Sequence, residues 1–414
     1  MSAINKLSWA VITASVAPGV FASDFTDSSF VKDSTLSVLS RNYYFNRDFR
    51  GDGVSQSKRD EWAQGFIATF NSGFTPGTVG VGFDAIGMLG LKLDSSSDRI
   101  NSGLLPASGN GTPGVDKAQD EYSKGAVAVK FKVSKSILKI GQQMVKNPVF
   151  NTNDSRLLPE TAEGSSLTVK EIDNLTLDAG HFTSLRLKER TANNSGALRQ
   201  IDYMGGVYKF TPGLSAALYA SSVKDYWDKR YLGVNWVHQL DDLQSVKLDF
   251  AGYQQKSIGE ALSGELDVKA YSLKGTYTYG NHSFALAEQQ IHGTGKYMYG
   301  TDGGDTNYLA NYIQYMDGTK ENEKSWQARY DYDFAGLGIP GLALQAKYVK
   351  GTGAKVSATI DDAKEWERDL QVSYVIQSGP VKGLSFRVRQ ATYRNDFNSP
   401  LDEVRFITEY PLSL

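Results

Sequence analysis

Along most of the chain, apolar and polar residues alternate with a period of two. In the segment 326–334, the even positions hold Trp, Ala, Tyr, Tyr and Phe, and the odd positions hold Gln, Arg, Asp and Asp. Similar alternation returns in 342–348, 370–377 and 386–389. Because successive residues of a strand point to opposite faces of a sheet, each segment predicts a strand with one apolar and one polar face.

Extended over the whole chain, this pattern predicts about 18 strands, an even number that places both ends of an antiparallel barrel on one side. The predicted strands span residues 34–45, 61–71, 77–93, 124–133, 136–144, 165–172, 174–184, 199–210, 213–223, 230–240, 245–255, 267–279, 282–291, 324–335, 341–351, 366–378, 382–394 and 402–414.

The connections between these strands alternate in length. Short turns are expected at 71–76, 134–135, 173–174, 211–213, 240–244, 280–281, 335–340 and 378–381. Long loops are expected at 46–60, 94–123, 145–164, 185–198, 256–266, 292–323, 352–365 and 395–401, with one short member at 224–229. Short periplasmic turns and long external loops are typical of outer-membrane β-barrels.

A charged face that is repeated strand after strand predicts a water-filled interior with lipid outside. Lys130 and Lys132 alternate with Val129 and Phe131. A lysine that faces lipid at mid-bilayer costs about 2–4 kcal/mol, so both lysines are expected to point into the lumen. The same periodicity places three further cations on lumen faces: Lys274, Arg329 and Lys347.

Composition agrees with this fold class and excludes others. Hydrophobic residues make up 40% of the chain and the mean hydropathy is −0.37, so beyond the N-terminus no stretch reaches the roughly 20 apolar residues of a spanning helix. The absence of cysteine excludes disulfides and thiolate sites. Lys and Arg total 44 against 46 Asp and Glu, without a basic block, so nucleic acid is not an expected partner.

Residues 1–22 have the three parts of a cleaved secretory signal. Lys6 supplies the positive charge, residues 7–16 form a short apolar run, and residues 20–22 form a small-residue cleavage site. A buried N-terminal helix is the alternative interpretation. We expect a mature chain of residues 23–414 that forms a single barrel domain in the outer membrane of a Gram-negative cell.

The chemistry-bearing residues do not indicate catalysis. The four histidines lack metal-ligand spacing, and His181 has neither a nucleophile motif nor suitably spaced triad partners. The glycines around 300–304 do not form a phosphate-binding motif. We therefore expect no catalytic residue, no metal and no cofactor.

Six motifs occur in order along the chain: RNYYFNRD at 41–48, SRLLPET at 155–161, AGHFT at 179–183, KSWQARYD at 324–331, QSGP at 377–380 and SFRVRQ at 385–390. Together they resemble the OprD family of substrate-specific porins of pseudomonads. The resemblance covers essentially the whole mature chain. It implies an 18-stranded barrel with a ladder of basic side chains along one wall and inward-folded loops that narrow the pore.

The resemblance assigns four ladder members by motif: Arg387, Arg389, Lys132 and Arg47. Arg387 and Arg389 are two residues apart on one predicted strand, so they lie about 7 Å apart on one face. A carboxylate can pass between neighbours at that spacing, because each guanidinium can grip it in two places. Structural ion pairs with lumen acids, such as Asp331 or Glu409, are the alternative for both arginines.

Two loops are implied to narrow the pore. The constricting third loop of the family matches residues 145–164, which places Arg156 near the narrowest point, although Arg156 could instead pin its own loop. In the 292–323 loop, Asp305 is expected to oppose the ladder and accept an amino group or a hydroxyl. The Gly-Gly-Asp sequence at 303–305 is also ordinary turn chemistry.

We expect a passive, substrate-selective channel for small carboxylate-bearing organic acids, because rows of Arg and Lys lower the barrier for an anion and several weak sites let it leave. A preference for basic amino acids or small peptides is one alternative, and an occluded barrel with a structural or binding role is another. The expected partners are small-molecule carboxylates, outer-membrane lipid and the assembly machinery, which reads the C-terminal strand. Leu414 stands where the terminal aromatic is usual, and monomer and loose trimer both stay open.

Overall fold

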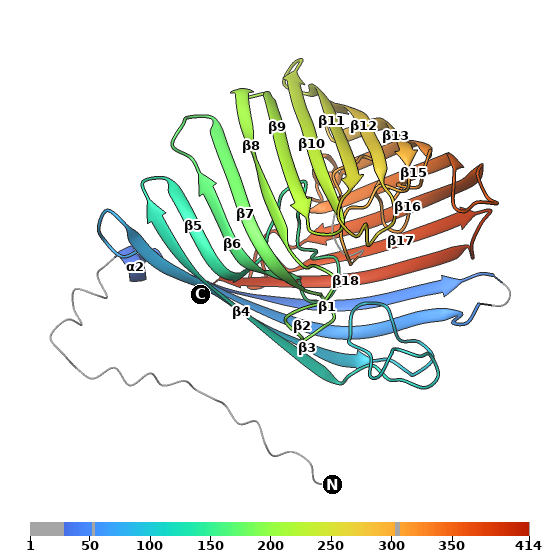
Figure 1. The fold of residues 1–414 in the computed structure, drawn as a ribbon, viewed down its shortest axis with the longest axis horizontal. Helices are drawn as coiled ribbons and strands as arrows, with labels where there is room; N and C mark the ends of the chain where they lie inside the picture. The colour runs from blue at the N-terminus through green and yellow to red at the C-terminus, as the bar shows by residue number, and fades with distance from the viewer. Residues whose placement is uncertain (1–28, 52–53, 303–306, 414) are drawn as a thin grey trace, which may run out of the picture.

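A computed structural model describes residues 29–51, 54–302 and 307–413 (Figure 1). They form one antiparallel sheet of 18 strands, which the pairing of β1 with β18 closes into a barrel. The predicted fold class is therefore confirmed. The strands are β1 (Thr35–Phe49), β2 (Lys58–Asn71), β3 (Gly80–Asp94), β4 (Glu121–Val133), β5 (Ser136–Gln143), β6 (Thr161–Val169), β7 (Leu175–Arg186), β8 (Ile201–Thr211), β9 (Leu214–Val223), β10 (Trp227–Gln239), β11 (Gln244–Ser257), β12 (Asp267–Tyr279), β13 (His282–Thr294), β14 (Lys324–Asp333), β15 (Leu342–Ala354), β16 (Ala363–Val375), β17 (Ser385–Asn395) and β18 (Leu401–Ser413).

Two short helices complete the secondary structure of the described residues. Helix α2 (Ser29–Lys32) precedes β1, and the 3-10 helix η1 (Phe334–Leu337) follows β14. Within the described ranges, neither helix is long and apolar enough to cross a membrane. Figure 1 shows α2 and the end of β18 at the same rim of the barrel. The predicted signal segment, residues 1–22, lies outside the described residues.

Burial along the strands is inverted relative to a soluble protein. On β4, Val127 and Val129 are 58% and 41% exposed, whereas Lys124 and Lys130 are 5% and 6% exposed. The apolar face points outward and the charged face points into the lumen, as the two-residue alternation predicts.

The short turns lie on the rim that carries α2. Ser134 and Lys135 join β4 to β5, and Gly280 and Asn281 join β12 to β13. Ser134 has φ of 53° and Gly280 has φ of 54°. Two-residue hairpins require this left-handed backbone, because its twist matches that of the flanking strands.

The lumen is not lined by ions alone, because long loops fold into it. Two of them, the third loop (residues 144–160) and the seventh loop (residues 295–323), line one cavity in the lumen. In the third loop, Leu157 and Leu158 are fully buried. They pack in one cluster with lumen-facing aromatic residues of β1, including Tyr43 and Phe45. Apolar side chains therefore occur on the inner face where a loop covers them.

Candidate functional site

The third loop is held inside the barrel by Arg41 of β1. The Nη1 group of Arg41 donates hydrogen bonds to Asp154 Oδ1 (2.7 Å) and to the carbonyl oxygens of Arg156 (2.8 Å) and Leu157 (3.2 Å). Its Nε group donates to Glu409 Oε1 of β18 (2.7 Å). One guanidinium therefore ties the loop to the seam at which β1 meets β18.

The seventh loop is held by carboxylates on the lumen face of β16. The backbone amide of Gln314 donates to Asp369 Oδ2 (3.3 Å), and the amide of Tyr315 donates to Glu367 Oε1 (3.0 Å). The other oxygen of Glu367 accepts the amide of Met316. These bonds satisfy backbone groups that would otherwise be buried without a partner.

A cavity of about 760 Å³, here called the central cavity, lies between the two loops and the barrel wall. The third loop contributes residues 144–146 and 151–155, and the seventh loop contributes residues 307–310 and Tyr312. The wall contributes four lumen-facing side chains: Lys274, Gln327, Arg329 and Lys347. Three cations that the alternation places in the lumen therefore border one cavity.

The three cations differ in their ion pairs. Lys274 Nζ lies 3.4 Å from Asp249 Oδ2. Arg329 donates from Nε and Nη2 to the two oxygens of Asp331, at 2.6 and 2.8 Å. Among the described residues, Lys347 has neither a hydrogen-bond partner nor a carboxylate within ion-pair distance. Its charge is available to an anion in the cavity, as is that of Lys146 in the third loop, for which the described residues likewise provide no ion pair.

A second group of cations surrounds the ring of Phe45. The guanidinium carbons of Arg47, Arg156 and Arg405 lie 5.3, 5.1 and 5.5 Å from the centre of this ring. Glu403 accepts hydrogen bonds from Nε of Arg47 (2.7 Å) and of Arg405 (2.5 Å). We call these three guanidinium groups the arginine cluster. Two of them bind the single buried carboxylate of Glu403 and Arg156 does not, so the cluster has a net positive charge.

Arg156 connects the third loop to the second loop, residues 95–120. Its Nε group donates to the carbonyl oxygen of Ser102 (3.0 Å), and its Nη1 group donates to that of Ser155 (3.0 Å). Burial, and after it the charge of Arg405, lowers the pKa of Arg156 to about 10, so the side chain stays charged at neutral pH. Arg156 therefore pins its own loop and also lies among the lumen arginines.

Arg387 and Arg389 lie on the inner face of β17, but only one of them is paired. Arg387 Nη2 lies 3.8 Å from Glu409 Oε2. This is the structural ion pair with a lumen acid that the sequence allows as an alternative to a ladder role. Arg389 lies opposite Arg405 in the β17–β18 register. Within the described part of the chain, Arg389 has no hydrogen bond and no ion pair.

Two predicted ladder residues lie elsewhere. Lys130 pairs with Asp84 (2.6 Å), which also pairs with Lys139. Lys132 is next to the turn that follows β4 and lies 5.4 Å from the ring centre of Phe74. Both lysines are on the lumen face, but the arginine cluster and the central cavity are built from other residues. Asp305 lies outside the described residues.

Sequence reasoning missed two arginines with central positions. Arg41 is only 6% exposed and Arg405 only 3% exposed. Arg41 binds the third loop, and Arg405 donates to the carbonyl oxygen of Gln314 in the seventh loop (3.1 Å). Arg405 stands on the polar face of the last predicted strand, so periodicity alone carries a signal for it. On the lumen face of β1, Arg41 and Arg47 flank the aromatic residues Tyr43 and Phe45. The two faces of β1 therefore differ less in polarity, and the sequence pattern is a weaker signal for Arg41.

A closed barrel of 18 strands with inward loops and a cationic lumen defines an outer-membrane porin. The family model described as "outer membrane porin, OprD family" matches residues 28–414. Porin D of Pseudomonas aeruginosa is 39% identical, over 99% of this chain and 100% of Porin D. The chain therefore belongs to the OprD family and is a protein of the Gram-negative outer membrane, as its sequence predicts.

Two solved structures have the same architecture. The crystal structure of Pseudomonas aeruginosa OccK9 (OpdG) is similar with a TM-score of 0.89 and 39% identity, covering 93% of this chain and 100% of that one. The crystal structure of Pseudomonas aeruginosa OpdK with vanillate is similar with a TM-score of 0.86 and 34% identity, with the same coverage.

Proposed function

We propose that this porin takes up small carboxylate-bearing organic acids by passive diffusion through the central cavity. The observation that carries the proposal is the position of Lys347, a lumen cation without a carboxylate partner among the described residues, on the wall of that cavity. An uncompensated cation lowers the free energy of an anion in a narrow, water-filled passage. The binding of vanillate, a small aromatic acid, in the related OpdK structure agrees with this substrate class.

The arginine cluster and Arg389 form the approach to the cavity in this proposal. Arg47 and Glu403 are paired near the outer ends of β1 and β18, and Arg405 follows two residues further inward with Arg389 opposite. Residues two apart on a strand are separated by about 7 Å, so a carboxylate can move between guanidinium groups without a large gap. Several weak sites in succession favour passage over retention.

A preference for basic amino acids is the second candidate, and Asp154 is the observation that favours it. Asp154 borders the central cavity and its side chain is 50% exposed, although it pairs with Arg41. An exposed carboxylate in the passage can accept an ammonium group from a substrate. The cavity wall nevertheless carries Lys274, Arg329 and Lys347 on the facing strands, which favours anions.

Uptake into liposomes tests the two candidates directly. Purified protein is reconstituted, and the entry of propanoate, benzoate, lysine and arginine is compared with that of the neutral analogues propanamide and benzamide. The proposal predicts faster entry of the two acids than of their amides. Faster entry of lysine and arginine than of the acids would support the second candidate, and no entry of any solute, with no ion current, would indicate an occluded barrel.

A further inference from the structure

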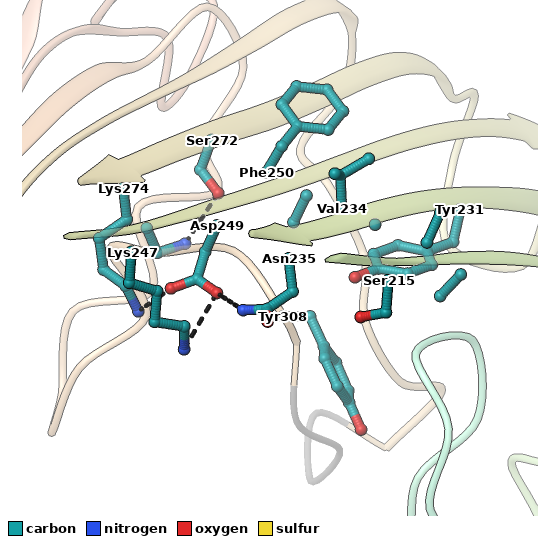
Figure 2. A pocket seen from close by; sticks show the side chains of 15 residues that line it. Ser215, Tyr231, Val234, Asn235, Lys247, Asp249, Phe250, Ser272, Lys274 and Tyr308 are labelled. Carbon is teal, nitrogen blue, oxygen red and sulfur yellow. Dashed lines mark hydrogen bonds and ion pairs between the residues drawn. The ribbon is translucent and has the colours of Figure 1, made fainter. Parts of the chain in front are cut away.

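A second cavity, of about 240 Å³, opens in the inner wall formed by β9 to β12 (Figure 2). We call it the wall recess. It shares Lys274, Tyr308 and Ala310 with the central cavity, so the two spaces adjoin at the seventh loop. Ser215 and Ala217 lie near the beginning of β9, which places the recess toward the rim of short turns.

The strand register builds this recess from three parallel rows of inner-face residues. The row nearest the long loops is aromatic, the middle row has almost no side chains, and the row nearest the short turns is polar. The rows are Tyr219, Tyr231 and Tyr253; then Ala217, Gly233 and Ala251; then Ser215, Asn235, Asp249 and Lys274. The hollow exists because three neighbouring strands carry only Ala or Gly at one level.

A side chain added at Gly233 would close part of this hollow. A Cβ atom there would lie 2.3 Å from the hydroxyl oxygen of Tyr231, which is closer than two unbonded heavy atoms approach. Tyr231 and Tyr308 meet edge to face with ring centres 6.1 Å apart. The rings give the hollow an apolar side, and the third row gives it a polar side.

Asp249 is the charged centre of the polar side. Its Oδ1 accepts a hydrogen bond from Asn235 Nδ2 (2.5 Å) and lies 3.1 Å from Lys247 Nζ. Its Oδ2 lies 3.4 Å from Lys274 Nζ, yet it is buried and accepts no hydrogen bond from the described residues. Figure 2 shows both lysines at one end of the recess and Tyr231 at the other.

We propose that the wall recess is a separate binding site for small organic acids that carry a hydroxyl group beside the carboxylate. This inference rests on the proposed function, because the acid must first pass the central cavity. The ligand carboxylate contacts Lys247 and Lys274, its hydroxyl donates to the Asp249 carboxylate, whose side chain is 26% exposed, and its hydrocarbon part lies on the Ala and Gly floor beside the tyrosine rings.

The chemistry selects for the hydroxyl. Two ammonium groups around one carboxylate leave one positive charge for the ligand carboxylate. The partly exposed Asp249 carboxylate accepts only one hydrogen bond from the described residues, that from Asn235. It therefore favours a ligand that supplies a further donor, which an analogue without the hydroxyl cannot do. A hydrogen bond to a charged group corresponds to about tenfold in affinity.

A matched pair of acids tests this site. Lactate and propanoate differ only in the hydroxyl, and each is titrated against the ion current of single channels in planar bilayers. We expect lactate to reduce the current at a concentration about tenfold lower than propanoate. Asp249→Leu, which removes the acceptor, should bring the two concentrations together, and Ala217→Leu, which fills the floor, should raise both. Asp361→Asn, at an exposed loop position, is the control and should keep the wild-type ratio.

The outcomes separate the two proposals. If lactate and propanoate act equally on the wild type, or if Asp249→Leu keeps the wild-type ratio, the wall recess is not the selective site, whatever the liposome result. If propanoate and benzoate enter liposomes faster than their amides but the channels do not discriminate lactate from propanoate, the proposed function stands and only the recess is overturned. If neither propanoate nor benzoate enters liposomes faster than its amide, the proposed function fails, and the recess assignment fails with it.

Discussion

Lys347 and Arg389 are lumen cations that no described residue binds by a hydrogen bond or an ion pair, unlike Arg329 and Arg47. Arg329 is gripped by both oxygens of Asp331, and Arg47 is bound to Glu403. A neutralised cation holds the wall together, whereas an unpaired cation acts on a passing anion. A lumen cation should therefore affect permeation most where no carboxylate lies beside it.

Neutralising Lys347 should slow the passage of acids. One unit charge about 4 Å from an anion in water contributes about 1 kcal/mol, so Lys347→Gln should reduce carboxylate uptake by liposomes roughly fivefold relative to the amide. Lys364→Gln, which removes an exposed lysine at the outer end of β16, is the matched control. Equal uptake by Lys347→Gln and the control would remove Lys347 from the pathway.

Arg41 should act on gating rather than on affinity. Arg41→Met removes the bonds to Asp154, Arg156, Leu157 and Glu409, so the third loop should loosen. We expect larger fluctuations of the open-channel current and faster proteolysis within residues 144–160. Arg50→Met removes an arginine of the outer rim that is 54% exposed and should leave both readouts unchanged. A quiet, protease-resistant Arg41→Met channel would contradict this role.

The direction of these side chains could be predicted from sequence, but their partners could not. A two-residue period fixes that Arg387 and Arg389 point the same way. It does not show that Glu409 reaches Arg387 and not Arg389, because Glu409 comes from the next strand and its position depends on register. Arg41 and Asp154 are 113 residues apart, and no local pattern joins them.

At the scale of elements, β16 and the seventh loop form one unit. Glu365, Glu367 and Asp369 alternate on the inner face of β16 and are nearly fully buried. Glu365 accepts hydrogen bonds from Lys320 Nζ (2.5 Å) and from the hydroxyl of Tyr393. The alternation of residues predicts β16 as a strand. It does not predict that the seventh loop binds to the inner face of β16, because a loop can fold inward only into the space that the closed barrel leaves.

The seventh loop should bind less strongly to the barrel wall at alkaline pH. Burial, and after it the charge of Glu365, raises the pKa of Glu323 from 4.5 to about 8. Below about pH 4.5, Glu323 does not reduce the stability of the docked loop, because its carboxyl is protonated whether the loop is docked or released. The docked loop loses stability as the pH rises from there to about 8, because only the released carboxyl ionises freely.

Current fluctuations between pH 6 and pH 9 measure this effect. We expect them to increase with pH in the wild type and to stay constant in Glu323→Gln. Glu321→Gln is the control in the same loop, because the hydrogen bond from Lys355 lowers the pKa of Glu321 and keeps it charged across this range. A Glu323→Gln channel with the wild-type pH dependence would refute the assignment to Glu323.

At the scale of the whole molecule, the pairing of β1 with β18 brings charged residues from the first and the last strand together. Arg41 pairs with Glu409, and Arg47 with Glu403, across this seam. The arginine cluster therefore exists only in the closed barrel, with Arg156 added by the third loop. A sequence read strand by strand predicts the barrel and its cationic interior, but the cluster itself is a product of closure.

The reversal potential of single channels in a potassium chloride gradient tests the central claim most directly, namely that lumen cations select anions. We predict an anion-selective wild type and a clear shift toward cations in the double variant Arg387→Gln and Arg389→Gln, with normal assembly of the barrel. The same reversal potential in the wild type and the double variant would contradict the account.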